Sequence, residues 1–149
     1  MHVHRLNAYQ IAPESTKALQ GVEAYLEQSG LDKKLADLVR MRASQINGCA
    51  YCLDMHSKDL RRLGEPEQRL YVLSGWRESP AFTPRERAAL AWTDALTLIA
   101  GAPAPDTVYE ELRRHFSDKE IVDLTTLIGM INLWNRLAIA MRYEHPMSR

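Results

Sequence analysis

The sequence lacks the features that mark several large classes of protein. Its 149 residues include two cysteines, Cys49 and Cys52, which are too few and too closely spaced for a secreted disulfide scaffold. The 19 acidic and 19 basic side chains give no formal net charge, which argues against binding to nucleic acid or to an anionic membrane surface. Repeats and linkers are also missing, so we expect one domain over residues 1–149.

Long apolar runs are missing as well. The N-terminal segment MHVHRLNAYQIAPES contains no stretch that would serve as a signal peptide. The most apolar stretch, 124–140, is too short for a membrane span and carries Asn132, Asn135 and Arg136, so we expect a buried helix there. These features predict a cytoplasmic protein, in which a CxxC pair is redox-active or binds a metal.

The pattern of caps and breaks along the chain is that of helices, and no segment alternates as a strand does. Two capping boxes, Thr83–Glu86 and Ser117–Glu120, begin helices that extend to about Ala100 and about Arg142. The other predicted helices are Pro13–Ser29, Asp32–Asn47, Cys49–Leu63, Pro66–Ser74 and Asp106–Phe116. We therefore predict an all-α, single-domain helical bundle of about six to seven helices, with the CxxC at the start of the third helix.

The last predicted helix is apolar on most of its sides. A helix with so little polar surface needs cover all round. It is expected to be the central helix of the bundle, to lie partly at a subunit interface, or both. We accordingly expect a homo-oligomer.

The most informative segment is the pair of cysteines followed by a histidine. At about 100° per residue, Cys49, Cys52 and His56 fall within an arc of roughly 60° on one helix, on its apolar side. Cys49 lies at the helix N-terminus, where unpaired backbone N–H groups favour an anion, and His56 is a proton acceptor for Cys52. The spacing also allows the two sulfurs to form a disulfide, while burial disfavours the charged thiolate.

An acidic residue is expected near this group. If Asn47 and Gly48 reverse the chain, Asp37 lies level with about Lys58, within one turn of His56. A carboxylate there would orient the imidazole. Asp37 points away from the apolar stripe of its own helix, so this role requires the helix to be covered on a second side. The alternative is a solvated carboxylate.

Two simpler interpretations of the CxxC remain open at this point. The cysteines are then either small hydrophobic residues packed in a core, or zinc ligands together with His56. A structural zinc site needs four ligands, and Asp37, His2 or His4 would supply the last.

The arrangement of these residues resembles that of a known family. Asp37 stands twelve residues before the CxxC and His56 four residues after it, on either side of the segment RMRASQINGCAYC, which begins at Arg40 and ends at Cys52. With the later segments GWRESP and NLWNR, this pattern resembles the carboxymuconolactone decarboxylase-like superfamily, in its alkylhydroperoxidase D-type, peroxidase-related branch. The resemblance extends from about Pro13 to Arg142. The family acid is usually glutamate, and no glutamate lies between Leu31 and Asn47.

The resemblance implies an all-helical fold that assembles as trimers or hexamers, and thiol peroxidase chemistry without a metal or organic cofactor. Carried over, Cys52 attacks the hydroperoxide, Cys49 resolves the sulfenic acid, His56 is the base and Asp37 the distal acid. A lipoyl or thioredoxin-like protein would supply electrons. The alternatives are a dithiol–disulfide exchange adaptor that reduces a partner such as a peroxiredoxin, and a non-catalytic helical assembly module.

Overall fold

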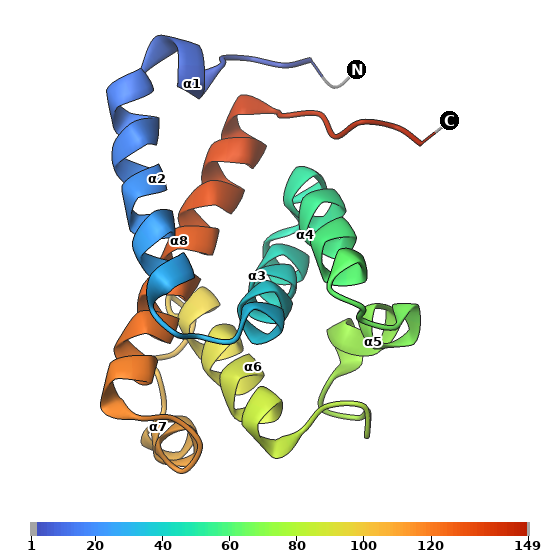
Figure 1. The fold of residues 1–149 in the computed structure, drawn as a ribbon, viewed down its shortest axis with the longest axis vertical. Helices are drawn as coiled ribbons and strands as arrows, with labels where there is room; N and C mark the ends of the chain where they lie inside the picture. Colours follow the sequence, from blue (N-terminus) through green and yellow to red (C-terminus); the bar gives the residue numbers. More distant parts are fainter. Residues whose placement is uncertain (1–2, 149) are drawn as a thin grey trace.

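Eight α-helices and one 3-10 turn make up the regular structure in a computed structural model, which describes residues 3–148 (Figure 1). The elements are α1 (Ala8–Ile11), α2 (Pro13–Gln28), α3 (Lys33–Asn47), α4 (Ala50–Arg62), α5 (Glu67–Val72), a 3-10 turn (Leu73–Gly75), α6 (Pro84–Thr97), α7 (Asp106–Arg113) and α8 (Asp118–Met141). No strand occurs within this range. The predicted all-α bundle is confirmed.

One helix was not predicted. The seven predicted helices correspond to α2–α8, and α1 is an additional short helix, so the CxxC begins the fourth helix. Helix α1 has four residues, is capped by the side chain of Asn7 and contains no buried residue. It therefore has no apolar periodicity that the sequence would show. Of the zinc ligands considered above, His2 lies outside the described residues.

Local chemistry explains the clearest helix boundaries. Both capping boxes are formed, by Thr83 with Glu86 and by Ser117 with Glu120. In each, the cap hydroxyl accepts a backbone N–H of the first turn and the glutamate accepts the N–H of the cap. Gly48 ends α3 with φ of 71°, a left-handed conformation that glycine adopts without strain. Chain reversal at Gly48 makes Cys49 the N-cap of α4.

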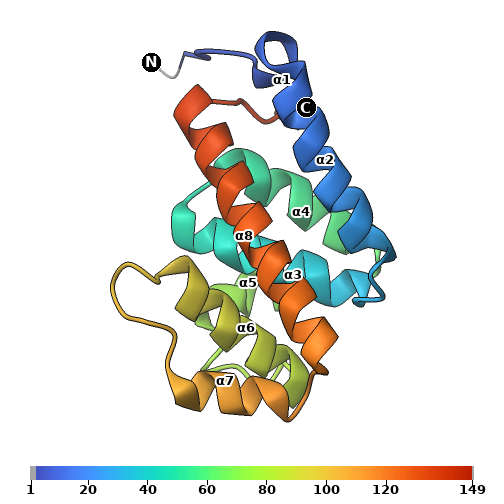
Figure 2. The same cartoon turned by 90° about the vertical axis from the view of Figure 1, so that its left-hand side faces the viewer.

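Helix α8 packs against α2, α3, α4, α6 and α7, and it runs across the face of the bundle that is nearest the viewer in Figure 2 (Figures 1 and 2). It is long and apolar enough to cross a membrane by length and composition alone, a test that the core helix of a soluble protein also passes. Leu124, Leu127 and Ile131 are almost fully buried against the neighbouring helices. Val122 and Ile139 are exposed, so the bundle covers α8 on one side and not all round, as a central helix would require.

The two ends of the described chain lie at the same end of the molecule (Figures 1 and 2). The backbone N–H of Arg5 donates to the carbonyl of Met141 at 2.9 Å, which ties the N-terminal segment to the end of α8. The CxxC segment lies close to this junction, because Cys49 and Cys52 pack against Ala138 and Tyr143.

Candidate active site

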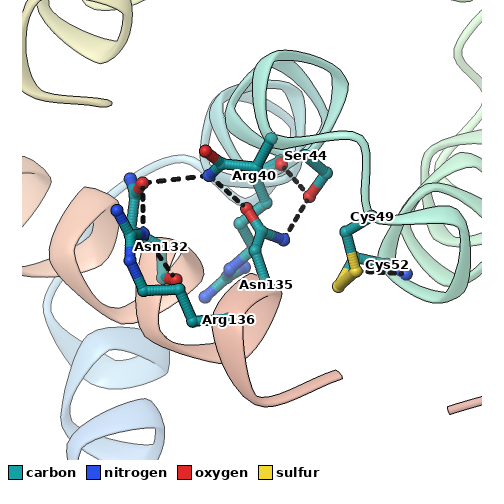
Figure 3. The surroundings of a disulfide bond; sticks show 8 residues. Arg40, Ser44, Cys49, Cys52, Asn132, Asn135 and Arg136 are labelled. Carbon is teal, nitrogen blue, oxygen red and sulfur yellow. Dashed lines mark hydrogen bonds between the residues drawn. A yellow bond between two sulfur atoms is a disulfide. The ribbon is translucent and has the colours of Figure 1, made fainter. Parts of the chain in front are cut away.

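Cys49 and Cys52 form a disulfide at the start of α4 (Figure 3). Their side chains are almost completely buried, with 1% and 3% of each residue exposed. The sulfur of Cys49 also caps the helix, because it accepts the backbone N–H of Cys52 at 3.3 Å. Cys49 precedes α4 as its N-cap, and Cys52 and His56 lie four residues apart within the helix.

Amide side chains hold the turn before the disulfide against α8. Asn47 donates through Nδ2 to the Oδ1 atoms of Asn135 and Asn132, at 2.9 and 3.0 Å. Asn135 in turn donates to the hydroxyl of Ser44 at 3.0 Å (Figure 3). Asn135 and Ser44 are fully buried, so the network fixes the end of α3 where the CxxC begins. Arg136 is exposed and bonds to Asn132 of its own helix.

A cavity of about 340 Å³ opens beside Cys52 between α2, α3, α4 and α8. We call it the His56 cavity. It is lined by both apolar and charged side chains, including Cys52, His56, Asp37, Arg40, Glu23, Tyr51, Met55, Leu127, Ile131, Trp134 and Tyr143. This volume suits a small organic molecule bound against the disulfide.

His56 is buried in the wall of this cavity and is held in its neutral form. Burial lowers the pKa of the imidazole below its ordinary 6.5, and the nearby Arg40 guanidinium lowers it further, while Asp37, Asp59 and Glu23 oppose both effects. Within residues 3–148, Nδ1 has no hydrogen-bond partner, and Oδ2 of Asp59 lies 4.0 Å away. A neutral, unpaired imidazole near a cysteine is suited to accept its proton.

Asp37 lines the same cavity but binds Arg40 and not His56. Its Oδ1 accepts Nη1 of Arg40 at 2.8 Å, and Lys33 Nζ lies 3.5 Å from its Oδ2. The carboxylate is 2% exposed, so it is not the solvated side chain of the alternative interpretation. Helix α2 supplies the cover on the second side of α3 that a buried Asp37 requires.

Three side chains of the site were not recognised in the sequence. Nη2 of Arg40 donates to Oε2 of Glu23 at 3.0 Å, and Nε1 of Trp134 donates to Oε1 of the same carboxylate at 2.9 Å. A glutamate thus reaches the site from α2, outside the interval in which the family pattern would have it. Glu23 stands between the apolar Val22 and Leu26, the one signal in the sequence that it faces inward.

The tryptophans divide between core and site. Trp76 and Trp92 are buried core side chains, whereas Trp134 lines the His56 cavity. Among the described residues, no group of three or more His, Cys, Asp and Glu side chains is arranged to hold a metal ion.

The sequence model of the Carboxymuconolactone decarboxylase family matches residues 13–95, more than half of the chain. The chain belongs to the carboxymuconolactone decarboxylase family. Within this family it resembles a protein of unknown function from Agrobacterium tumefaciens, provisionally named antioxidant defence protein AhpD. The two share 49% identity and a TM-score of 0.95 over 98% of this chain and 100% of the other.

Two further proteins are similar to this chain over most of its length. The uncharacterized protein YdfG of Bacillus subtilis (strain 168) is 43% identical over 137 residues, covering 92% of this chain and 93% of YdfG. An uncharacterized peroxidase-related protein from Silicibacter sp. TM1040 is 28% identical with a TM-score of 0.81, over 92% of this chain and 73% of the other. The chain is therefore of the AhpD-type, peroxidase-related branch.

Proposed function

We propose that the protein is a cofactor-free dithiol peroxidase that reduces hydroperoxides, through a sulfenic acid on Cys52 and then the Cys49–Cys52 disulfide. The observation that carries this proposal is the largely buried, neutral His56 in the cavity that Cys52 lines, whose Nδ1 has no hydrogen-bond partner among the described residues. The peroxidase-related relatives support the same chemistry.

The first step consumes the hydroperoxide. His56 accepts the thiol proton of Cys52, and the resulting thiolate attacks the terminal oxygen of the hydroperoxide. The O–O bond breaks, Cys52 becomes a sulfenic acid, and the leaving alkoxide takes the proton from His56 to give an alcohol. The neutral form of His56 is required, because an imidazolium accepts no proton.

The second step closes the disulfide. The sulfur of Cys49 attacks the sulfenic sulfur of Cys52, and the hydroxyl group leaves as water. Because both cysteines lie in the first turn of α4, the bond forms without a change of fold, and it is present in the structure. An external dithiol then returns two electrons.

Intact-mass spectrometry of reduced protein tests the proposal directly. One equivalent of an organic hydroperoxide is expected to remove about two mass units from the wild type, because two thiol hydrogens are lost. Cys49→Ser is expected to gain one oxygen atom and Cys52→Ser to remain unchanged. His56→Gln is expected to slow the reaction by about a hundredfold, the typical contribution of a general base.

The contrary result is equally clear. An unchanged wild-type mass, with both thiols still free after unfolding, would exclude direct peroxidase chemistry. Disulfide exchange with a partner such as a peroxiredoxin would then be the function to test, and thiols inert to every dithiol would leave a non-catalytic assembly module.

We further propose a cytoplasmic homo-oligomer, trimer or hexamer, that buries the outer face of α8. Val122, Gly129, Leu133 and Ala140 are exposed and lie on one side of that helix at intervals of seven, four and seven residues. Such an apolar stripe needs cover. Sedimentation analysis of wild type and Leu133→Arg tests this, with dissociation expected for the variant and a monomeric wild type as the contrary outcome.

A further inference from the structure

The two sulfurs of the disulfide line different cavities. Among residues 3–148, Cys52 lines the His56 cavity and Cys49 does not. Cys49 lines a second cavity of about 420 Å³, of which Cys52 forms no part. We call it the C-terminal cavity, because Glu144, His145 and Met147 line it together with Gly48 and Ala50.

A wall of three side chains separates the cavities. Tyr51, Ala138 and Tyr143 line both of them and pack against the disulfide. The left-handed turn at Arg142, with φ of 55°, leads the chain back so that the N–H of Tyr143 donates to the carbonyl of Ala138 at 2.9 Å. The hydroxyl of Tyr143 accepts the N–H of Ala8 at 3.1 Å. Hydrogen bonds of Tyr143 therefore connect this wall to the end of α8 and to the N-terminal helix α1.

Thiol–disulfide exchange has a strict geometry. The incoming thiolate approaches along the S–S axis, on the side of the attacked sulfur that faces away from the leaving sulfur. Cys52 lines the His56 cavity and Cys49 lines the C-terminal cavity, so a thiolate reaches Cys52 from the first cavity and Cys49 from the second.

Charge distinguishes the two routes. The His56 cavity is lined by four carboxylates and two fixed cations, namely Glu23, Glu27, Asp37, Asp59, Lys33 and Arg40. The one carboxylate among the described residues lining the C-terminal cavity is Glu144. An anionic thiolate is repelled more strongly from the first cavity, where carboxylates outnumber fixed cations by two, than from the second, where the excess is one. A neutral hydroperoxide is repelled from neither.

We propose that the C-terminal cavity is the binding site of the dithiol reductant, which attacks Sγ of Cys49, whereas the hydroperoxide reacts at Cys52 from the His56 cavity. The hydroperoxide half of this statement rests on the proposed function. The reductant half is tested without any peroxide.

The exchange balances in two steps. The first thiolate of the reductant bonds to the sulfur of Cys49, the Cys49–Cys52 bond breaks, and Cys52 leaves as a thiolate. The second thiolate of the reductant then attacks its own first sulfur and releases Cys49 as a thiolate. The two protons lost by the reductant end on the two cysteines, and the reductant leaves as a disulfide.

This direction of attack has a functional consequence. The sulfur released first is Cys52, which appears as a thiolate in the cavity where the next hydroperoxide binds. Reductant and hydroperoxide need not exchange places in one cavity, because each has its own access to the disulfide.

Trapping the mixed disulfide identifies the attacked sulfur. Wild-type protein, fully oxidised to the disulfide, is treated with a limiting amount of 2-mercaptoethanol and quenched with excess N-ethylmaleimide. Tandem mass spectrometry of the peptide that carries both cysteines is expected to locate mercaptoethanol on Cys49 and maleimide on Cys52.

A matched pair of variants tests the route. Ala50 lines the C-terminal cavity alone, so the larger side chain in Ala50→Phe is expected to slow reduction of the disulfide by 2-mercaptoethanol at least tenfold. Ala24→Phe makes the same change at an exposed position of α2 that lines neither cavity, and is expected to leave that rate unchanged. Mercaptoethanol found on Cys52, or an undiminished rate in Ala50→Phe, would overturn the proposal. Because no peroxide is present, these outcomes are independent of the peroxidase test.

Discussion

The carboxylate of Asp37 is bound to the guanidinium of Arg40, with 2.8 Å between Oδ1 and Nη1, although Asp37 and His56 line the same cavity. The same guanidinium binds Glu23 of α2 at 3.0 Å. Arg40 thus joins two acids to the wall of the site and also lowers the pKa of the neighbouring imidazole. Burial first and Arg40 second lower the pKa of His56, whereas the carboxylates of Asp37 and Glu23 raise it.

Removal of Arg40 should destabilise the fold. Arg40→Met leaves the buried carboxylate of Asp37 without its main partner, and losing one member of a buried ion pair costs about 3–5 kcal/mol. Urea unfolding at neutral pH measures the loss. The double variant Arg40→Met/Asp37→Leu removes the stranded charge and should recover much of the stability. A single variant as stable as the wild type would contradict this account of the pair.

The stability of the protein should depend on pH through His56. The folded-state pKa of His56 lies below its ordinary 6.5, so near and below that pH the unfolded chain binds more protons than the folded one. The contribution of neutral His56 is therefore fully present above pH 6.5 and is lost as the pH falls from 6.5 toward the folded pKa. The free energy of unfolding is compared for wild type and His56→Gln, both with the disulfide intact, at about pH 7.5 and about pH 5.5. The advantage of the wild type should shrink at the lower pH, and a constant difference would show that His56 does not carry the effect.

The site should discriminate against negatively charged hydroperoxides. Four carboxylates against two fixed cations line the His56 cavity, and Cys52 reacts there in the proposed mechanism. For two organic hydroperoxides that differ only in one carboxylate group, kcat/KM should be about tenfold lower for the anion, equivalent to about 1.4 kcal/mol. The difference in kcat/KM between the two substrates should be smaller in Asp59→Asn and at high salt. Equal values for the two substrates in the wild type would count against this electrostatic selection.

The amide network behind the disulfide should carry stability as well. Asn135 is fully buried and bonds both Asn47 and Ser44. Asn135→Leu removes both of these hydrogen bonds, while Asn47 keeps its bond to Asn132 and Ser44 keeps its bond to the carbonyl of Arg40. The expected loss is about 0.5–1.5 kcal/mol for each hydrogen bond removed. Thermal or urea unfolding measures the loss of stability, and substitution of the exposed Arg136 in Arg136→Ala is the control. Similar stabilities for Asn135→Leu and Arg136→Ala would contradict a structural role for the network.

Substitution of Gly48 should destabilise the protein because of its backbone conformation, and not because a side chain lacks space there. Its φ is 71°, and a Cβ added there meets no atom within 4 Å. Gly48→Ala should cost about 1–2 kcal/mol, the penalty of a side chain in the left-handed region. Gly48→Asn should cost less, because asparagine tolerates that region better. Equal losses for the two variants would argue against the backbone as the cause.

Local sequence features predict the seven longer helices and the order of two thiols and an imidazole along α4. Two capping boxes, a glycine after Asn47 and the i, i+3, i+7 spacing of Cys49, Cys52 and His56 are local features, and local hydrogen bonds and the helical repeat decide them. The short helix α1 was not predicted, because a single capped turn without a buried side chain has no periodic pattern.

The surroundings of the two cysteines and His56 depend on how the helices pack, and the sequence pattern did not predict them. Glu23 reaches the site from α2, and Arg40 takes the carboxylate of Asp37 that the sequence pattern would have assigned to His56. The separation of the two cavities depends on Tyr143, which returns to the disulfide from the far end of the chain. Burial, charge and access are properties of side chains brought together by packing, and no spacing along the chain encodes them.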